Sequence, residues 1–375
     1  LNATGLAFSA ANDFGSGIGM FVTQIEVGRN LLINVGAAAL IAILTISIQR
    51  LTPTLFVAVI ALLSLVPLAL SGHASGSANH GLAVNSLGLH LVGVSVWFGG
   101  LTALAVLRAR GAVGSAIVRR YSTLALLSFI VVTGSGLMSG WLRIGSLHAI
   151  GSPYGQLLLL KTGLLVVLGV FGAVHRRRAI PGLETGKVAF WRLIAVEAML
   201  MAGTIGVAAA LSRTAPPLNP SLLVGTTPAE ILTGEKLPPE LTFERYFTEF
   251  KLDSLWLTIC ALAIVGYSIG VLRLRRRGDK WSPARTTSWM FGMLLLAYIT
   301  NGAFNAYQEY LFSVHMMAHM LLSMAVPILL VPGAPVTLIS RATEKRQDQS
   351  RGLREWVLWA VHTRYARLIS HPIVA

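Results

Sequence analysis

The chain contains a single cysteine, Cys260, and only 15 acidic residues among its 375. One cysteine excludes a disulfide within the chain, a CxxC redox pair and a thiolate cage for a metal ion. Charged residues make up only 12% of the chain, whereas hydrophobic residues make up 54% and the mean hydropathy is +0.68. Because the apolar residues fall in blocks near the length of a membrane-spanning helix, we predict an all-α, polytopic helix bundle embedded in the lipid bilayer.

Two further classes of protein lack support in the sequence. The net charge of +15 does not indicate a nucleic-acid partner, because the basic residues lie in short segments between apolar runs instead of on a soluble basic patch. No nucleophile–base pair, glycine-rich phosphate loop or carboxylate dyad is evident, so we do not expect an enzyme.

The apolar runs predict about nine membrane spans. These are residues 27–49, 53–71, 84–107, 121–142, 154–174, 190–211, 253–272, 287–304 and 310–331. Alternate connecting segments are basic, namely residues 108–120, 176–178, 273–277 and 341–354. Basic segments of membrane proteins face the cytoplasm, so we predict that the N-terminus is outside and the C-terminus inside.

The start of the chain and the connector in its middle each differ in composition from the apolar spans. The chain opens with Leu1 in a polar stretch typical of an external loop, so we expect it to be a portion of a longer protein with earlier and later helices. Residues 212–251 form an external connector with six prolines. Near its end, Phe243, Phe247 and Phe250 share a helical face, which predicts a short helix at the membrane interface.

The segment SVHMMAHMLLSM, residues 313–324, holds two imidazoles and up to four thioethers but no acidic residue. His315 and His319 are four residues apart, so on a helix they lie on one face about one turn from each other. Imidazole and thioether donors suit Cu(I), whereas a zinc protease helix would place Glu where Met316 stands. We therefore predict a Cu(I) site made by these histidines with Met316 and Met320; methionine that merely fills gaps between helices is the alternative.

Further polar residues lie in or beside the predicted spans. Six of the nine histidines fall on the predicted outer side: His73, His80, His90, His148, His315 and His319. Of these, we count His73, His80 and His90 as further candidate copper ligands, although a loop histidine taken singly is more often a solvated polar residue.

Two ionisable residues, Lys161 and Glu197, lie within predicted spans, at depths that argue against a direct ion pair. We expect Glu197 to be neutral, bonded to a polar neighbour or in contact with a cation in transit. Lys161 either has a role in transport or extends its ammonium toward the membrane surface. Trp97 shares a helical face with His90 and is a further candidate polar residue.

The first part of the chain resembles the CopD copper-transport family. The resemblance rests on LHLVGVSVWFGG at residues 89–100, RRYSTLALLSFIVVTGSG at 119–136, YGQLLLLK at 154–161 and the VEAML run around Glu197. The later part resembles the CtaG family of cytochrome c oxidase assembly factors through LDSLW at 252–256, YLFSVHMMAHMLLSMAVPILLVPGAP at 310–335, and His371 followed by Pro372. We therefore expect a CopD-like domain at residues 1–215 and a CtaG-like domain at 216–375, fused as in actinobacterial proteins.

These resemblances imply a multi-pass protein of the bacterial cytoplasmic membrane. Its expected function is to bind Cu(I) and to deliver or transport copper for assembly of the copper centre of cytochrome c oxidase. The expected partners are oxidase subunits or other copper chaperones. One alternative is a haem-binding electron carrier, with His90 and either His315 or His319 as axial ligands. Another is a metal-free scaffold for respiratory oxidase subunits.

Overall fold

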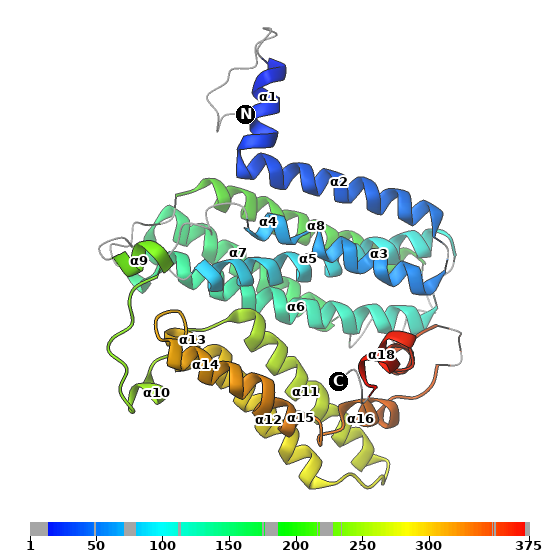
Figure 1. Ribbon diagram of the computed structural model, residues 1–375. Coiled ribbons are helices and arrows are strands. Elements are labelled where there is room, and N and C mark those ends of the chain that lie inside the picture. Colours follow the sequence, from blue (N-terminus) through cyan, green and yellow to red (C-terminus); the bar gives the residue numbers. More distant parts are fainter. Residues whose placement is uncertain are drawn as a thin grey trace. The chain divides into compact units, whose positions relative to one another are not determined.

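The computed structural model describes residues 14–48, 50–70, 80–111, 114–174, 176, 187–215, 217, 228–233, 235–346, 348 and 350–371. Over these residues the chain is helical and contains no β-strand, which confirms the predicted all-α class (Figure 1). It divides into two compact units, Leu1–Leu237 and Pro238–Ala375. The predicted domain boundary at residues 215–216 lies in the same connector as this division, on its N-terminal side.

The first unit consists mainly of long helices. They are α1 (Phe14–Gln24), α2 (Glu26–Ser47), α3 (Leu51–Leu63), α4 (Val66–Leu70), α5 (His80–Ala109), α6 (Ser115–Ile144), α7 (Pro153–Val174), α8 (Lys187–Arg213) and the short α9 (Pro228–Thr233), with a 3₁₀ turn at Leu147–Gly151. The polar start that we expected to be an external loop includes α1, because the apolar residues that follow Gly17 continue a helix.

Glycines allow α5 to approach α6 closely. A Cβ atom at Gly93 would lie 2.7 Å from Val132 Cγ2, and one at Gly100 would lie 3.0 Å from Tyr121 Cε2. A larger residue at Gly93 would require Val132 to shift, and one at Gly100 would crowd the Tyr121 ring, so both glycines favour the close approach. The resulting contact fixes the side of α5 that faces the remaining helices, which is the side that carries His90 and Trp97.

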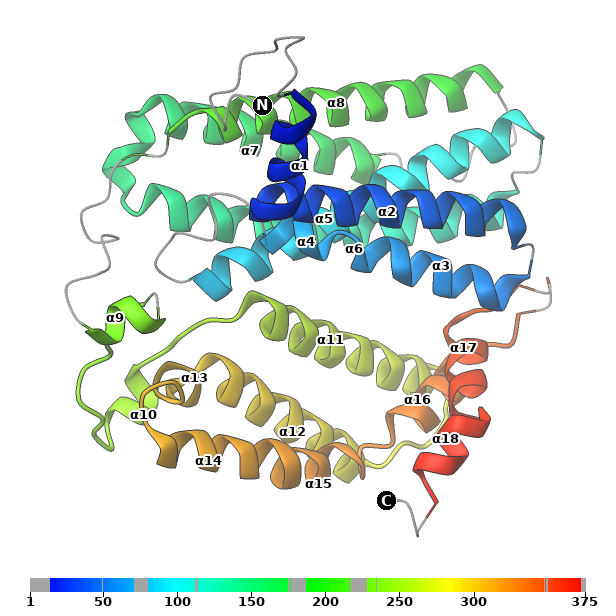
Figure 2. The ribbon, with the colours of Figure 1, turned by 45° about the horizontal axis from the view of Figure 1, so that its top comes forward.

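The second unit packs its helices around a separate core (Figure 2). Its elements are α10 (Arg245–Thr248), α11 (Ser254–Arg276), α12 (Pro283–Asn301), α13 (Ala303–Tyr307), α14 (Phe312–Met320), a π-helical turn (Leu321–Ala325), α15 (Val326–Leu330), α16 (Pro335–Ala342), α17 (Leu353–Val361) and α18 (Arg364–Ile369). Helix α12 lies beside α11 and α15, and its buried Met293, Leu296 and Ile299 contribute to the core.

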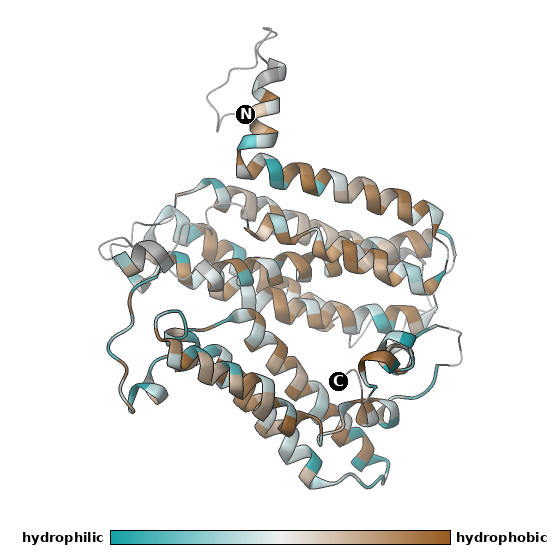
Figure 3. Ribbon diagram, in the orientation of Figure 1, coloured by the Kyte–Doolittle hydropathy of each residue, from teal (hydrophilic) through white to brown (hydrophobic). Residues whose placement is uncertain are grey.

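Eight stretches of the described residues are long and apolar enough to cross a membrane. They are Val27–Ser47, Leu51–Leu70, Gly81–Ala109, Ser115–Ile144, Pro153–Val174, Ile194–Arg213, Ser254–Arg276 and Phe312–Ala342. Figure 3 shows hydrophobic residues along the long helices and more hydrophilic ones near their ends. The remaining predicted span, residues 287–304, covers α12 from Thr287 onward and the start of α13, and it is not among the eight. Arg285 and Asn301, near the two ends of α12, lower the hydropathy of that helix.

The end of the connector is held by side chains of α12 and α13 that donate hydrogen bonds to its backbone carbonyls. Tyr298 donates to the Tyr246 carbonyl at 2.6 Å, Tyr307 donates to the Pro239 carbonyl at 2.8 Å, and the Asn305 amide donates to the Lys251 carbonyl at 2.8 Å.

The short helix predicted after Pro239 is a single turn, α10, because extended backbone resumes at Glu249. Of the three phenylalanines predicted to share a helical face, only Phe247 lies in α10, because Phe243 precedes the helix and Phe250 follows it. All three are exposed, as an interfacial position requires.

Packing of α12 against α15 gives a stability prediction. A Cβ atom at Gly292 would lie 2.6 Å from Leu330 Cδ2 and 3.1 Å from Leu329 Cβ, and the Leu329 atom is held by the backbone. We expect Gly292→Ala to lower the free energy of unfolding by about 1–3 kcal/mol, as overpacking of a tight contact usually does. Thermal unfolding of the protein in detergent measures the change.

Gly266→Ala in α11 is the matched control, because nothing lies within 4 Å of a Cβ atom at that position. Alanine is a better helix former than glycine, so this control should be neutral or slightly stabilising. Equal unfolding temperatures for the two variants would contradict the packing described for Gly292.

Candidate functional site

Helix α14 carries the two histidines predicted to bind copper. The imidazole rings of His315 and His319 have centroids 5.0 Å apart and are tilted by 64° to each other. About 100° round the helix from them, Val314 and Ala318 are 1% and 2% exposed and pack into the core of the second unit, whereas the two histidines are exposed. The apolar face therefore orients the helix so that both imidazoles lie on the outside of this unit.

Methionines extend the histidine surface. Met316 and Met320 each follow a histidine by one residue, so they lie about 100° further round the helix. Both side chains are exposed, as are those of Met317 and Met324. Filling a gap in the core does not explain these methionines within the described second unit. The exposed side of α14 thus presents imidazole and thioether donors together.

The helix becomes irregular directly after the histidines. Residues Leu321–Ala325 form a π-helical turn in which the Val326 N–H donates to the Leu321 carbonyl. The Ser323 hydroxyl donates to the His319 carbonyl at 2.7 Å, and Pro327 has no N–H to continue the ladder. Turns of this kind are frequent at functional sites.

Over the described part of the chain, no three or more His, Cys, Asp or Glu side chains gather into a group that could hold a metal ion. A conventional site for zinc, magnesium or calcium is therefore missing from those residues. Methionine does not belong to that set of donors. The donors that α14 exposes are imidazoles and thioethers, a combination that suits soft ions.

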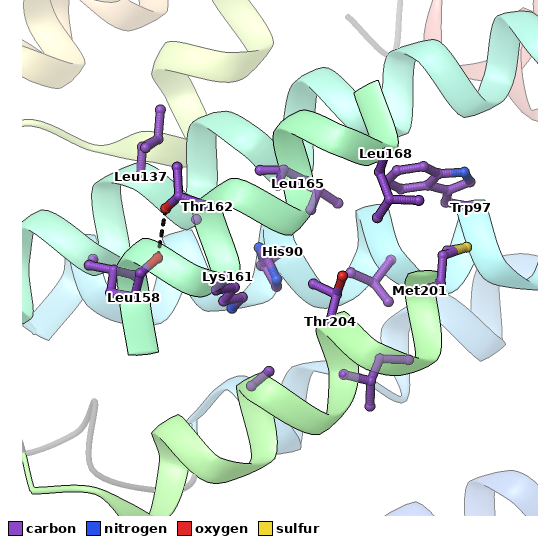
Figure 4. A pocket seen from close by; sticks show the side chains of 16 residues that line it. His90, Trp97, Leu137, Leu158, Lys161, Thr162, Leu165, Leu168, Met201 and Thr204 are labelled. Carbon is purple, nitrogen blue, oxygen red and sulfur yellow. Dashed lines mark hydrogen bonds between the residues drawn. The ribbon is translucent and has the colours of Figure 1, made fainter. Parts of the chain in front are cut away.

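A cavity of about 120 Å³ lies in the first unit, among α5, α6, α7 and α8 (Figure 4). His90 and Trp97 line it from α5, Lys161 from α7 and Met201 from α8, and most of the remaining wall is aliphatic. Gly136 of α6 leaves room for His90, since a Cβ atom there would lie 3.4 Å from His90 Cε1. The sequence pattern anticipated the common face of His90 and Trp97 but not the cavity itself.

Ser135 orients the imidazole of His90. The His90 Nδ1 and Ser135 Oγ atoms are 3.3 Å apart, and the Ser135 hydroxyl already donates to the Val131 carbonyl at 2.6 Å. Since the hydroxyl proton is used there, we assign the hydrogen of the neutral ring to Nδ1. That tautomer leaves the Nε2 lone pair free to bind a ligand.

Glu197 is held by two donors from other helices. Its Oε1 atom accepts hydrogen bonds from Trp97 Nε1 at 3.0 Å and from the Tyr121 hydroxyl at 3.3 Å. Trp97 is in turn packed edge-on against Phe129, with ring centroids 5.8 Å apart. Trp97 therefore contacts the cavity on one side and the Glu197 carboxyl on the other.

Sequence reasoning did not single out Tyr121. A signal for it was present, because the Gly99–Gly100 pair indicates a close helix approach and Tyr121 is the residue that approaches Gly100. Only the packing of α5, α6 and α8 together shows that its hydroxyl reaches Glu197.

Three candidates remain, namely His73, His80 and His371. His73 lies outside the described residues, and His80 begins α5 with a side chain outside the described set. His371 follows α18, where its N–H donates to the Leu368 carbonyl at 3.2 Å. His90 belongs to the first unit, whereas His315 and His319 belong to the second.

Comparison with protein families matches both units. Residues 4–83 match the Copper resistance protein D-like, N-terminal domain, residues 115–211 match Copper resistance protein D (CopD), and residues 265–375 match the Cytochrome c oxidase caa3 assembly factor (Caa3_CtaG). The chain joins CopD and CtaG segments. This confirms the resemblance seen in the sequence, and with the eight apolar stretches it makes the chain a multi-pass bacterial membrane protein.

Relatives of the CopD–CtaG chain share part of it. An uncharacterized protein of Mycobacterium tuberculosis is 38% identical over 147 residues, covering 39% of this chain and 22% of the relative. One of Mycobacterium leprae is 37% identical over 145 residues, covering 38% and 22%. The copper transport protein CutJ of Bacillus subtilis is 32% identical over 136 residues, covering 33% and 25%. The chain thus spans about a fifth to a quarter of the length of these relatives, and no solved structure matches it.

Proposed function

We propose that this protein handles copper in the bacterial cytoplasmic membrane, without acting as an enzyme. In this proposal the outer-face residues His315, Met316, His319 and Met320 bind Cu(I), which is then delivered or transported for assembly of the copper centre of cytochrome c oxidase. The observation that carries the proposal is the pair of imidazoles 5.0 Å apart beside exposed thioethers on α14. That helix lies in the segment that matches the oxidase assembly family.

The CopD-type half supports the copper part of the proposal. It matches a copper resistance family, and the chain has a relative described as a copper transport protein. His90 offers a free Nε2 in the cavity, and Trp97 links that cavity to Glu197. In our proposal this half receives or conducts copper, with oxidase subunits or other copper chaperones as partners.

Metal analysis of the purified chain tests the proposal against its alternatives. We expect a colourless protein that binds copper, retains it as Cu(I), and shows no Soret band. A Soret band with about one haem per chain would favour an electron carrier that uses histidine axial ligands. Oxidase subunits that co-purify with a chain that binds no copper would favour a metal-free scaffold.

A further inference from the structure

Lys161 of the CopD-type half lies in the cavity of the first unit, and the proposed copper binding gives it no role. It is the ninth residue of α7, about 12 Å along the helix from Pro153. Its side chain lines the cavity next to His90, so it points toward other helices (Figure 4). The expectation that its ammonium simply extends to the membrane surface does not account for this position.

The cavity provides no counter-ion for this ammonium. None of the residues that line it is acidic, and no ion pair joins Lys161 to another described residue. Glu197 does not line the cavity, and its Oε1 atom accepts from Trp97 and Tyr121. A cation held among apolar walls without an anion is costly, so an anionic group on a ligand would stabilise the site.

The other polar groups of the cavity limit which kinds of ligand it can bind. The hydroxyls of Thr162 and Thr204 each donate at 2.8 Å to a carbonyl of their own helix, those of Leu158 and Leu200. Lys161 and His90 therefore remain as the groups that can meet polar atoms of a ligand. The rest of the wall is mainly aliphatic, which favours a ligand with one charged group and an apolar remainder.

The opening of the cavity and its size suit a ligand that enters from the bilayer. Leu137 of α6 and Ile205 of α8 line the cavity and are also 56% and 49% exposed, so the cavity reaches the outer surface of the helices. Its volume of about 120 Å³ is close to that of engineered cavities that hold one benzene molecule. It can contain a charged headgroup and the first carbons of a chain, with the rest of the chain lying past Leu137 and Ile205.

We infer that this cavity binds an anionic amphiphile, whose carboxylate or phosphate group pairs with Lys161 and whose apolar chain extends into the bilayer. A free fatty acid and an anionic phospholipid share this chemistry. This binding rests on Lys161 and does not depend on copper binding at α14, although His90, proposed to take part in copper handling, lines the same cavity.

Native mass spectrometry of the full chain in detergent tests the inference with three probes: palmitate, methyl palmitate and phosphatidylglycerol. We expect palmitate or phosphatidylglycerol to bind at least about tenfold more tightly than methyl palmitate, because a hydrogen bond to a charged group is lost in the ester. Tighter binding of palmitate would identify a fatty acid, and tighter binding of phosphatidylglycerol a phospholipid. Equal binding of methyl palmitate and both anions would overturn the inference.

Variants connect the binding to Lys161. Lys161→Met keeps the length of the side chain without its charge and should weaken binding of the anionic probe by at least about tenfold. Lys161→Arg keeps the charge and should retain binding. Lys280→Met is the matched control, because Lys280 is exposed and lies in the second unit outside the cavity. Wild-type affinity in a folded Lys161→Met protein would overturn the inference.

A fourth variant tests the inference even if the Lys161→Met protein does not fold. Ala208→Phe fills the cavity from α8 while leaving Lys161 in place. We expect it to lose the anionic probe, with Lys161→Arg retaining it. Wild-type binding by Ala208→Phe would place the probe elsewhere and would also overturn the inference.

Discussion

His315→Ala combined with His319→Ala should remove most of the tightly bound Cu(I) and leave the second unit folded. The two imidazoles lie on the exposed side of α14, so their loss removes donors without opening the core made by Val314 and Ala318. Only thioether donors remain. We expect the affinity for Cu(I) to fall by at least about 10- to 100-fold, which is the loss seen when even a supporting partner of a metal ligand is removed. Titration against a chromogenic Cu(I) chelator measures this change.

Two variants sharpen that experiment. His148→Ala combined with His362→Ala also removes two imidazoles, from sites outside the α14 surface, and should leave copper binding unchanged. His315→Met combined with His319→Met should keep much of the affinity for Cu(I) but not for Zn(II), because thioethers suit only the softer ion. Unchanged stoichiometry and affinity in the folded double-alanine protein would remove the α14 site from the proposed function.

The positions of the helices followed largely from local sequence signals. The run predicted at residues 154–174 is α7, Pro153–Val174, because one uninterrupted apolar block bounded by polar residues leaves little choice. Helix α6 instead begins at Ser115, two turns before the predicted span, because Arg119 and Arg120 are good helix formers and can stay helical beyond the apolar block. Hydropathy marks the apolar part of a helix and not its full length.

Proline explains where the predicted spans are interrupted. The span at residues 53–71 is split into α3 and α4, because Pro67 cannot donate to the Leu63 carbonyl and α3 ends there. The span at 310–331 contains the π-helical turn just before Pro327. A hydropathy pattern averages over such residues, and so both spans were predicted as continuous helices.

Within the candidate sites, too, contacts between residues close in the sequence could be predicted, and contacts between distant residues could not. The pairing of His315 with His319 depends only on helical spacing, and the sequence was sufficient to predict that they share a face. The bonds from Trp97 and Tyr121 to Glu197 join residues 100 and 76 positions apart in the chain. Those bonds, and the cavity in which Lys161 lies, depend on how four helices pack, which spacing within one helix does not encode.

A role for the CopD-type half in copper handling predicts large defects from two substitutions that preserve its packing. His90→Ala removes the free Nε2 from the cavity, and His148→Ala is its control, because this change removes an imidazole of the same unit that does not line the cavity. Glu197→Gln keeps an amide oxygen that can accept from Trp97 and Tyr121 but removes the ionisable carboxyl group, and ionisable groups at such depth in a membrane are usually functional.

In copper-limited cells, we expect His90→Ala and Glu197→Gln each to raise the copper concentration required for half-maximal oxidase activity on the order of 10-fold, a loss typical of disturbed metal sites. Glu197→Gln should impair copper uptake across the membrane more than external binding, because Glu197 belongs to the first unit and is not among the α14 donors. Oxidase activity per unit of expressed protein, measured over a copper titration with His315→Ala as the reference defect, separates two cases. Wild-type curves for both substitutions, beside a defective His315→Ala protein, would make the CopD-type half a structural fusion partner and leave α14 as the functional site.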